Sequence, residues 1–235
     1  MRKLSGLASV GLIAIGLSVA ALAASPPTRV RGTIAAITGD TVTVQGYDGG
    51  TTAVMLRPDT RFAWVVRSSL SQIAQGDFIG TGATGPDSAL VALEVVIFPA
   101  AMRGAGEGHY PWSIPAAVAK ADAGGGAVAV GTMPVQGTMT NGTVAAVQGT
   151  MTNGTVTSGT AAAAGGRTMT ITFDKGHEVQ VTVPPNVPVV RFEPGQSSIL
   201  KTGDKVFIVA VKREGSDALT ANFIAVGKDG LMPPM

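Results

Sequence analysis

Residues 168–183 read Thr-Met-Thr-Ile-Thr-Phe-Asp-Lys-Gly-His-Glu-Val-Gln-Val-Thr-Val, and this stretch indicates the fold of the chain. Apolar and polar side chains alternate over residues 169–173 and again over residues 179–183. Such period-two alternation places one set of side chains on a buried face and the other in water, so each run predicts a β-strand. Asp174-Lys175-Gly176 lies between the runs and predicts a hairpin turn, because glycine tolerates positive φ.

A similar pattern occurs earlier in the chain, so the sequence contains an internal duplication. Thr41-Val42-Thr43-Val44 matches Thr168-Met169-Thr170-Ile171, and Gly76-Asp77 matches Gly203-Asp204. Residues from about 30 to 98 correspond in this way to residues from about 154 to 227, with an offset that stays between 126 at Asp48 and Asp174 and 129 at Ala89 and Ala218. A constant offset with shared turn residues predicts two halves of common architecture.

Each half is predicted to hold about five strands and one short helical turn, at residues 69–75 and 196–202. Five strands in so short a segment favour a small closed barrel, because closure removes exposed strand edges. We therefore predict an all-β chain with two related small five-stranded barrels, OB-like or similar, joined by a linker rich in Gly, Ala and Thr. The predicted boundaries are a signal peptide over 1–23, a first barrel domain over 28–99, an aromatic loop and flexible linker over 100–141, a second barrel domain over 142–228 and a tail over 229–235.

A shorter repeat lies in the joint between the halves. Residues 136–144 recur without change at residues 148–156, and each copy contains Asn-Gly, a strong hairpin signal. The stretch Gly142-Thr-Val-Ala-Ala-Val also resembles Gly32-Thr-Ile-Ala-Ala-Ile, so the second barrel has two candidate first strands, starting at Gly142 or Gly154. Either the extra copy only lengthens a loop, or one copy completes the barrel while the other pairs elsewhere.

The first residues predict export. Arg2 and Lys3 precede an apolar run over residues 12–22, and Ala21-Leu22-Ala23 is a small-x-small cleavage site. Cleavage after Ala23 is favoured over an uncleaved anchor because the run is short for a membrane span. The predicted location is periplasmic or secreted, and no later segment is long and apolar enough to cross a membrane.

Export also changes the charge of the protein. The whole chain has a formal net charge of +2, which comes from Arg2 and Lys3, so the mature chain is neutral. A neutral chain has no global electrostatic reason to bind nucleic acid. The sequence has no cysteine, which excludes disulfides and thiolate chemistry.

Few residues carry recognisable chemistry. The chain has two histidines, His109 and His177, and neither lies in a known catalytic or zinc-binding motif. Residues 80–85 match Gly-x-Gly-x-x-Gly, but Pro86-Asp87 and a predicted strand follow instead of a helix. We interpret them as a glycine-rich turn and not as a dinucleotide-binding loop.

The stretch from Met102 to Trp112 is the most unusual one. Tyr110 and Trp112 are predicted either to pack against a barrel as a plug or to form a binding lip. The candidate ligand-binding residues are Glu107, His109, Tyr110 and Trp112. For a metal, the candidates are His109, Met102 and Met133, because thioethers suit Cu(I). No cofactor is predicted.

Several of these motifs resemble an uncharacterised bacterial family of small exported β-domains, in its tandem form. They are Gly-Thr-Ile/Val, the Thr-Val-Thr-Val strand, Gly-Asp-x-Val and the Glu-Gly-His-Tyr-Pro-Trp loop at residues 107–112. The resemblance covers most of the mature chain and implies architecture, not activity.

We therefore predict an exported, non-enzymatic binding or interaction protein, whose partner is an unknown protein or envelope component. The first alternative is a periplasmic copper- or zinc-binding protein that uses the His109 loop, and the second is an uncharacterised hydrolase. A continuous apolar groove or open strand edge between the barrels favours binding. Convergence of His109 with Met or Glu favours a metal, and a Ser-His contact or paired carboxylates in a cleft favours hydrolysis.

Overall fold

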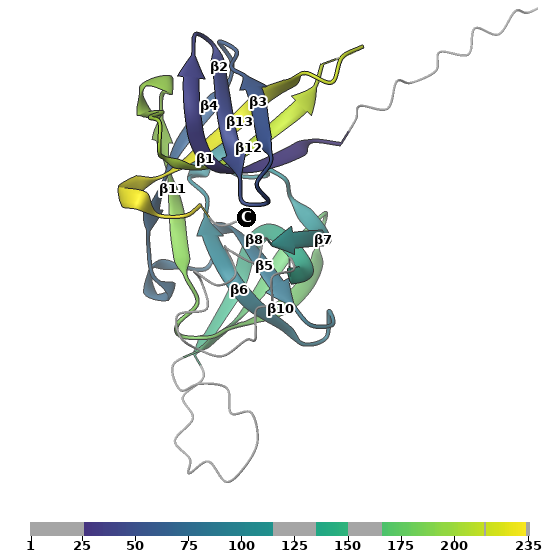
Figure 1. Cartoon of the computed structure of the whole chain (residues 1–235). Coiled ribbons are helices and arrows are strands. Elements are labelled where there is room, and N and C mark those ends of the chain that lie inside the picture. Colours follow the sequence, from purple (N-terminus) through teal and green to yellow (C-terminus); the bar gives the residue numbers. More distant parts are fainter. Residues whose placement is uncertain (1–25, 115–134, 150–165, 214, 234–235) are drawn as a thin grey trace, which may run out of the picture.

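A computed structural model describes residues 26–114, 135–149, 166–213 and 215–233 (Figure 1). The predicted signal peptide, Met133 and most of the second repeat copy lie outside these residues. The described part is all-β, as predicted, and no helix in it is long and apolar enough to cross a membrane. Its strands are β1 (Thr28–Thr38), β2 (Thr41–Gly46), β3 (Thr51–Met55), β4 (Arg61–Arg67), β5 (Phe78–Thr84), β6 (Leu90–Ile97), β7 (Gly108–Ile114), β8 (Val135–Gly149), β9 (Arg167–Phe173), β10 (His177–Val183), β11 (Val189–Gly195), β12 (Lys205–Lys212) and β13 (Leu219–Gly227).

Short 3-10 helices join some of these strands. They are η1 (Leu70–Gln72), η2 (Ala100–Met102), η3 (Ser197–Ile199) and η4 (Lys228–Gly230). Helices η1 and η3 lie inside the two segments predicted to form helical turns, which confirms their position. Each is a single 3-10 turn.

The lower lobe in Figure 1 is a closed five-stranded barrel, which we call the lower ring. Its strands pair in the order β10-β9-β8-β5-β6, and a parallel pairing of β10 with β6 closes it. Strand β7 pairs with the first part of β8, outside the ring. Strands β5 and β6 come from the first half of the sequence, whereas β8, β9 and β10 come from the second.

A second ring combines three strands of the first half with two strands of the second. Strands β1, β2 and β3 of the first half pair in sequence, β1 also pairs with β12, and β13 pairs with both β12 and β3. We call these five strands the upper ring. The sequence predicted one barrel within residues 28–99 and another within residues 142–228. The strand pairing does not follow these boundaries, because each ring contains strands of both halves.

Two equivalent glycines show how this exchange is fixed. The backbone N–H of Gly203 donates to the carbonyl of Ile34 at 2.8 Å, and that of Gly76 donates to the carbonyl of Val144 at 2.8 Å. Each Gly-Asp turn thus docks on the first strand of the opposite half. Both halves carry the same Gly-Asp turn, so alternation alone cannot tell pairing within a half from pairing across halves.

Strands β4 and β11 connect the two lobes. They pair with each other antiparallel, while β4 also pairs with β13 and β11 with β6. The buried apolar side chains form three clusters. One cluster fills the upper ring, a second fills the lower ring, and a third, the junction cluster, includes Ala63, Phe98, Trp112, Phe192 and Phe223.

The first copy of the short repeat lies within a strand. Asn141-Gly142, predicted as a hairpin turn, is inside β8, where Asn141 is buried and pairs with Gly80 on one side and Gly108 on the other. That expectation is wrong because β8 has strand neighbours on both sides, and these outweigh local turn preference. The copy that begins the second-half strand set is the one with Gly142.

Residues 80–84 also differ from expectation. They are strand β5, and only Gly85 has the positive φ of a turn, at 103°. The segment is followed by strand β6 and not by a helix. A dinucleotide-binding loop would open a helix, so the interpretation as a different structure agrees with the fold.

Candidate functional site

The predicted aromatic loop forms strand β7 and the segment that leads into it. Because side chains alternate along an extended strand, Tyr110 and Trp112 project to one side and His109 to the other. Pro111, which has no N–H, lies opposite Thr138 in β7, whose one strand partner among the described residues is β8. The loop therefore has two chemically different faces.

Trp112 packs inward as a plug. Its side chain is 5% exposed and belongs to the junction cluster. The guanidinium of Arg29 lies 4.1 Å from the Trp112 ring centroid, that of Arg31 lies 5.2 Å away, and Tyr110 meets Trp112 edge-on at 5.9 Å. Such cation–π contacts stabilise the packing of β1 of the upper ring against β7. Trp112 thus helps to join the two lobes, and its own side chain is buried.

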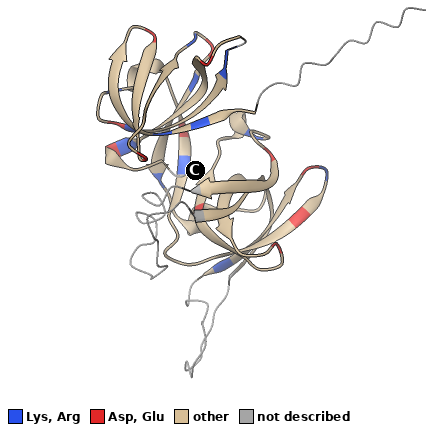
Figure 2. Ribbon diagram, turned by 45° about the vertical axis from the view of Figure 1, so that its right-hand side comes forward, with Lys and Arg blue, Asp and Glu red and all other residues tan. Residues whose placement is uncertain are grey.

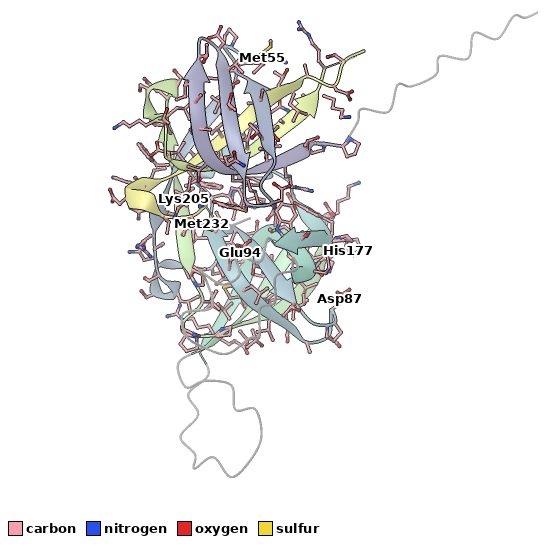
Figure 3. The ribbon with its side chains drawn as sticks, viewed as in Figure 1. Met55, Asp87, Glu94, His177, Lys205 and Met232 are labelled. Atoms are coloured by element: carbon pink, nitrogen blue, oxygen red, sulfur yellow. The ribbon has the colours of Figure 1, made fainter. Side chains whose placement is uncertain are left out.

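Beside Trp112, charged groups are buried at the junction. Glu94 of β6 is fully buried, near the centre of the molecule in Figure 3. Burial lowers the pKa of Arg31 to about 10, an effect that the negative charge of Glu94 opposes. Burial also raises the pKa of Tyr47 to about 12, against the influence of Arg31. These groups link the two rings electrostatically.

The other face of the loop is anchored to the lower ring. His109 Nδ1 lies 2.8 Å from Thr140 Oγ1, its Nε2 lies 3.2 Å from Asp87 Oδ1, and its ring stacks on Phe173 at 5.6 Å. Asp87 and His177 appear on the same side of this lobe in Figure 3. Glu107 Oε1 accepts a hydrogen bond from the backbone N–H of Asp174 at 3.2 Å. Both candidate residues thus hold the loop in place.

Thr140, His109 and Asp87 lie in a row, in the order of the hydroxyl nucleophile, base and orienting carboxylate of a catalytic triad. Thr140, however, is fully buried in β8, so a substrate has no path to its hydroxyl. The geometry offers a structural hydrogen-bond chain and does not expose a nucleophile.

The metal candidates are separated. His109 contacts Thr140, Asp87 and Phe173, whereas Met102 packs against the junction cluster and lines a groove. Met133 lies outside the described residues. In the ranges that the structure covers, no group of three or more His, Asp or Glu side chains could hold a metal ion.

An open groove of about 550 Å³ lies over the junction cluster. It is lined by the start of β4 and the residues before it, the end of β11 with η3, the η2 segment, and Phe223 of β13. Strand pairing brings these segments together, since β4 lies between β11 and β13. The groove therefore contains residues of both halves and borders both lobes.

The groove has an apolar floor and a polar rim. Ala63 and Phe223 are buried in the junction cluster, and Met102 packs against it. Pro58, Pro99 and Pro194 also line the groove, and their rings give it rigid apolar walls. The polar side chains at the rim include Arg61, Gln196 and Ser197.

Of the groove residues, sequence analysis singled out only Met102, and for a different chemistry. The others have no shared motif, because they lie in separate segments from Pro58 to Phe223 that meet only in the folded chain. The three prolines were the available signal, since proline is confined to strand ends, edges and bulges.

Basic and acidic residues occur on both lobes, so neither ring carries a single sign of charge (Figure 2). Comparison of the chain with models of protein families, with curated proteins and with solved structures finds no match.

Proposed function

We propose that this chain is an exported, non-enzymatic binding protein that holds a small, largely apolar ligand in the groove over the junction cluster. The observation that carries the proposal is the groove itself. Its volume of about 550 Å³ falls within the range of small-molecule sites, roughly 300–1,000 Å³. Export rests on the signal sequence in residues 1–23, and the resemblance to exported bacterial β-domains supports the same location.

The position of the groove supports binding. Ligand sites form preferentially where two structural units meet, with mostly apolar walls and a few polar groups. On this proposal the units are two five-stranded barrels, OB-like in closure, that exchange strands. A continuous apolar groove between them is the feature expected of the binding hypothesis.

The chemistry of the lining supports a non-enzymatic role. Among the described residues that line the groove, none is Asp, Glu, His, Lys or Tyr, so the groove presents no ordinary general acid or base. Its one buried hydroxyl, that of Thr60, already donates to the carbonyl of Ala221 at 2.9 Å. Binding without chemistry is the use that these side chains allow.

Calorimetric titration of the mature chain with ten-carbon amphiphiles tests the proposal. Binding with a Kd between about 10 µM and about 1 mM is expected for ligands of this size. The Ala101→Trp variant places an indole in the groove and should abolish binding. Ala53→Trp makes the same change at an exposed position of β3 and should bind normally. Absence of binding, or equal binding by both variants, would contradict the proposal.

A further inference from the structure

Arg61 is the one ionisable residue among the described residues that line the groove. It begins β4, where it pairs with Phe223 of β13. Side chains two residues apart on a strand share a face, so Arg61 lies on the same side of β4 as Ala63, which forms part of the groove floor. A positive charge therefore stands at the edge of an apolar surface.

This charge is not neutralised within the described chain. The side chain of Arg61 is exposed and makes no hydrogen bond or ion pair with the described residues. Asp59, two residues earlier, is held by Arg57, whose Nε donates to it at 2.8 Å. The Arg57 guanidinium also lowers the pKa of Asp59. Arg57 thus compensates this carboxylate and leaves Arg61 without an acidic partner.

The acidic residue that adjoins the opposite wall in sequence, Glu193, is compensated in the same way. Glu193 precedes Pro194 and accepts a hydrogen bond from Arg191 Nη2 at 2.8 Å. No carboxylate of the described chain lines the groove to repel an anion. The electrostatic balance at the rim therefore favours a negatively charged ligand group.

Two further donors belong to the same rim. Gln196 and Ser197 line the groove at the end of β11, and their side chains make no hydrogen bond with the described residues. An amide N–H and a hydroxyl can both donate to a carboxylate, and guanidinium groups bind carboxylates with matching geometry. The rim thus supplies donors and the floor supplies apolar surface.

We infer that the ligand of the groove is an amphipathic carboxylate, whose carboxylate binds at Arg61 and whose apolar body lies over Met102 and Phe223. This inference rests on the proposed function, since it assigns a ligand class to the same groove. It commits to a free alkyl or aryl carboxylic acid and not to a cationic or neutral amphiphile.

Paired titrations of the full mature chain test the inference. Decanoate and 1-decanol share a ten-carbon body and differ in the head group, so their comparison isolates the carboxylate. Decanoate is expected to bind about tenfold more tightly, as one charge-assisted hydrogen bond supplies. The Arg61→Gln variant should lose this tenfold preference with no change for 1-decanol, and Arg61→Lys should retain part of it.

Arg67→Gln is the matched control, because Arg67 ends the same strand, is exposed and does not line the groove. It should bind both compounds as the native chain does. Equal affinity for decanoate and 1-decanol, or a preference unchanged in Arg61→Gln, would overturn the carboxylate inference and leave the groove as a binding site. If neither compound binds, the proposed function fails as well.

Discussion

Val65 lies directly opposite Phe192 in the antiparallel pairing of β4 with β11, and Phe192 occupies the position in the second half that Val65 occupies in the first. The two residues are 127 positions apart, the same offset that relates Gly76 to Gly203. A residue that pairs with its own equivalent marks a local twofold axis. The pairing of β4 with β11 is symmetric about this pair, since Trp64 lies opposite Glu193 and Val66 lies opposite Arg191.

The interleaved halves should remain associated after the chain is cut between them. A specific protease site inserted between Gly124 and Gly125 separates β1–β7 from β8–β13 when cleaved. Because neither ring can close with strands of one fragment, both fragments should co-elute from a sizing column at the mass of the intact chain. Far-ultraviolet circular dichroism should also stay unchanged.

Denaturing electrophoresis verifies the cut, and the uncut insertion variant is the control. Strong denaturant should release two species, since only strand pairing and packing then hold them. Elution of two separately folded fragments without denaturant would show that each half closes on itself, contrary to the pairings of β1 with β12 and β5 with β8.

The strands could be predicted from sequence because their signal is local. Alternation over residues 168–183 corresponds to β9 and β10, and the turn between them has positive φ at Asp174, Lys175 and Gly176. Which strand pairs with which is not determined by the local sequence. Gly76 and Gly203 carry the same turn, so the sequence permits docking on either first strand, and only the folded chain shows the exchange.

The candidate site could be predicted only in part, for a related reason. The loop at residues 107–112 stood out by composition, and its aromatic and charged side chains proved to be packing and anchoring groups. The groove has no such local signal. Arg61, Gln196 and Phe223 look ordinary in sequence and become neighbours only through the pairing of β4 with β11 and β13.

Substitution of Gly32 by alanine should destabilise the fold by about 2–3 kcal/mol, the cost of a forced overlap in a packed interior. A Cβ at Gly32 would overlap the backbone carbonyl of Gln45, as one at the equivalent Gly142 would overlap that of Thr172. Urea unfolding measures the change. Gly50→Ala is the control, because the nearest atom to its Cβ would be Asp48 Oδ1 at 3.3 Å on the surface. A cost as small as that of Gly50→Ala would contradict the close approach.

Replacing Glu94 by glutamine should cost about 3–5 kcal/mol, because it removes a buried negative charge that stabilises the largely buried guanidinium of Arg31. The free energy of unfolding in urea reports this cost. Combination with Arg31→Gln should cost less than the two single changes added together, which is the signature of interacting sites.

Glu193→Gln is the matched control for this charge. Its partner is Arg191, and the two side chains are 38% and 47% exposed, so the pair contributes about 1 kcal/mol or less. Equal costs for the Glu94 and Glu193 variants would show that Glu94 is hydrated and not buried at the junction.

The two tyrosines should resist ionisation at alkaline pH. Burial raises the pKa of Tyr47 to about 12 and raises that of Tyr110 above its ordinary value of 10.0. Since burial favours the neutral form, the stabilisation from Tyr47 is fully present below pH 10 and is lost as the pH rises from about 10 to about 12. Absorbance at the phenolate band, followed in the Tyr110→Phe variant, isolates Tyr47, because the chain has two tyrosines. The folded variant should reach half-ionisation near pH 12 and the unfolded one near pH 10; a folded midpoint near 10 would place Tyr47 in water.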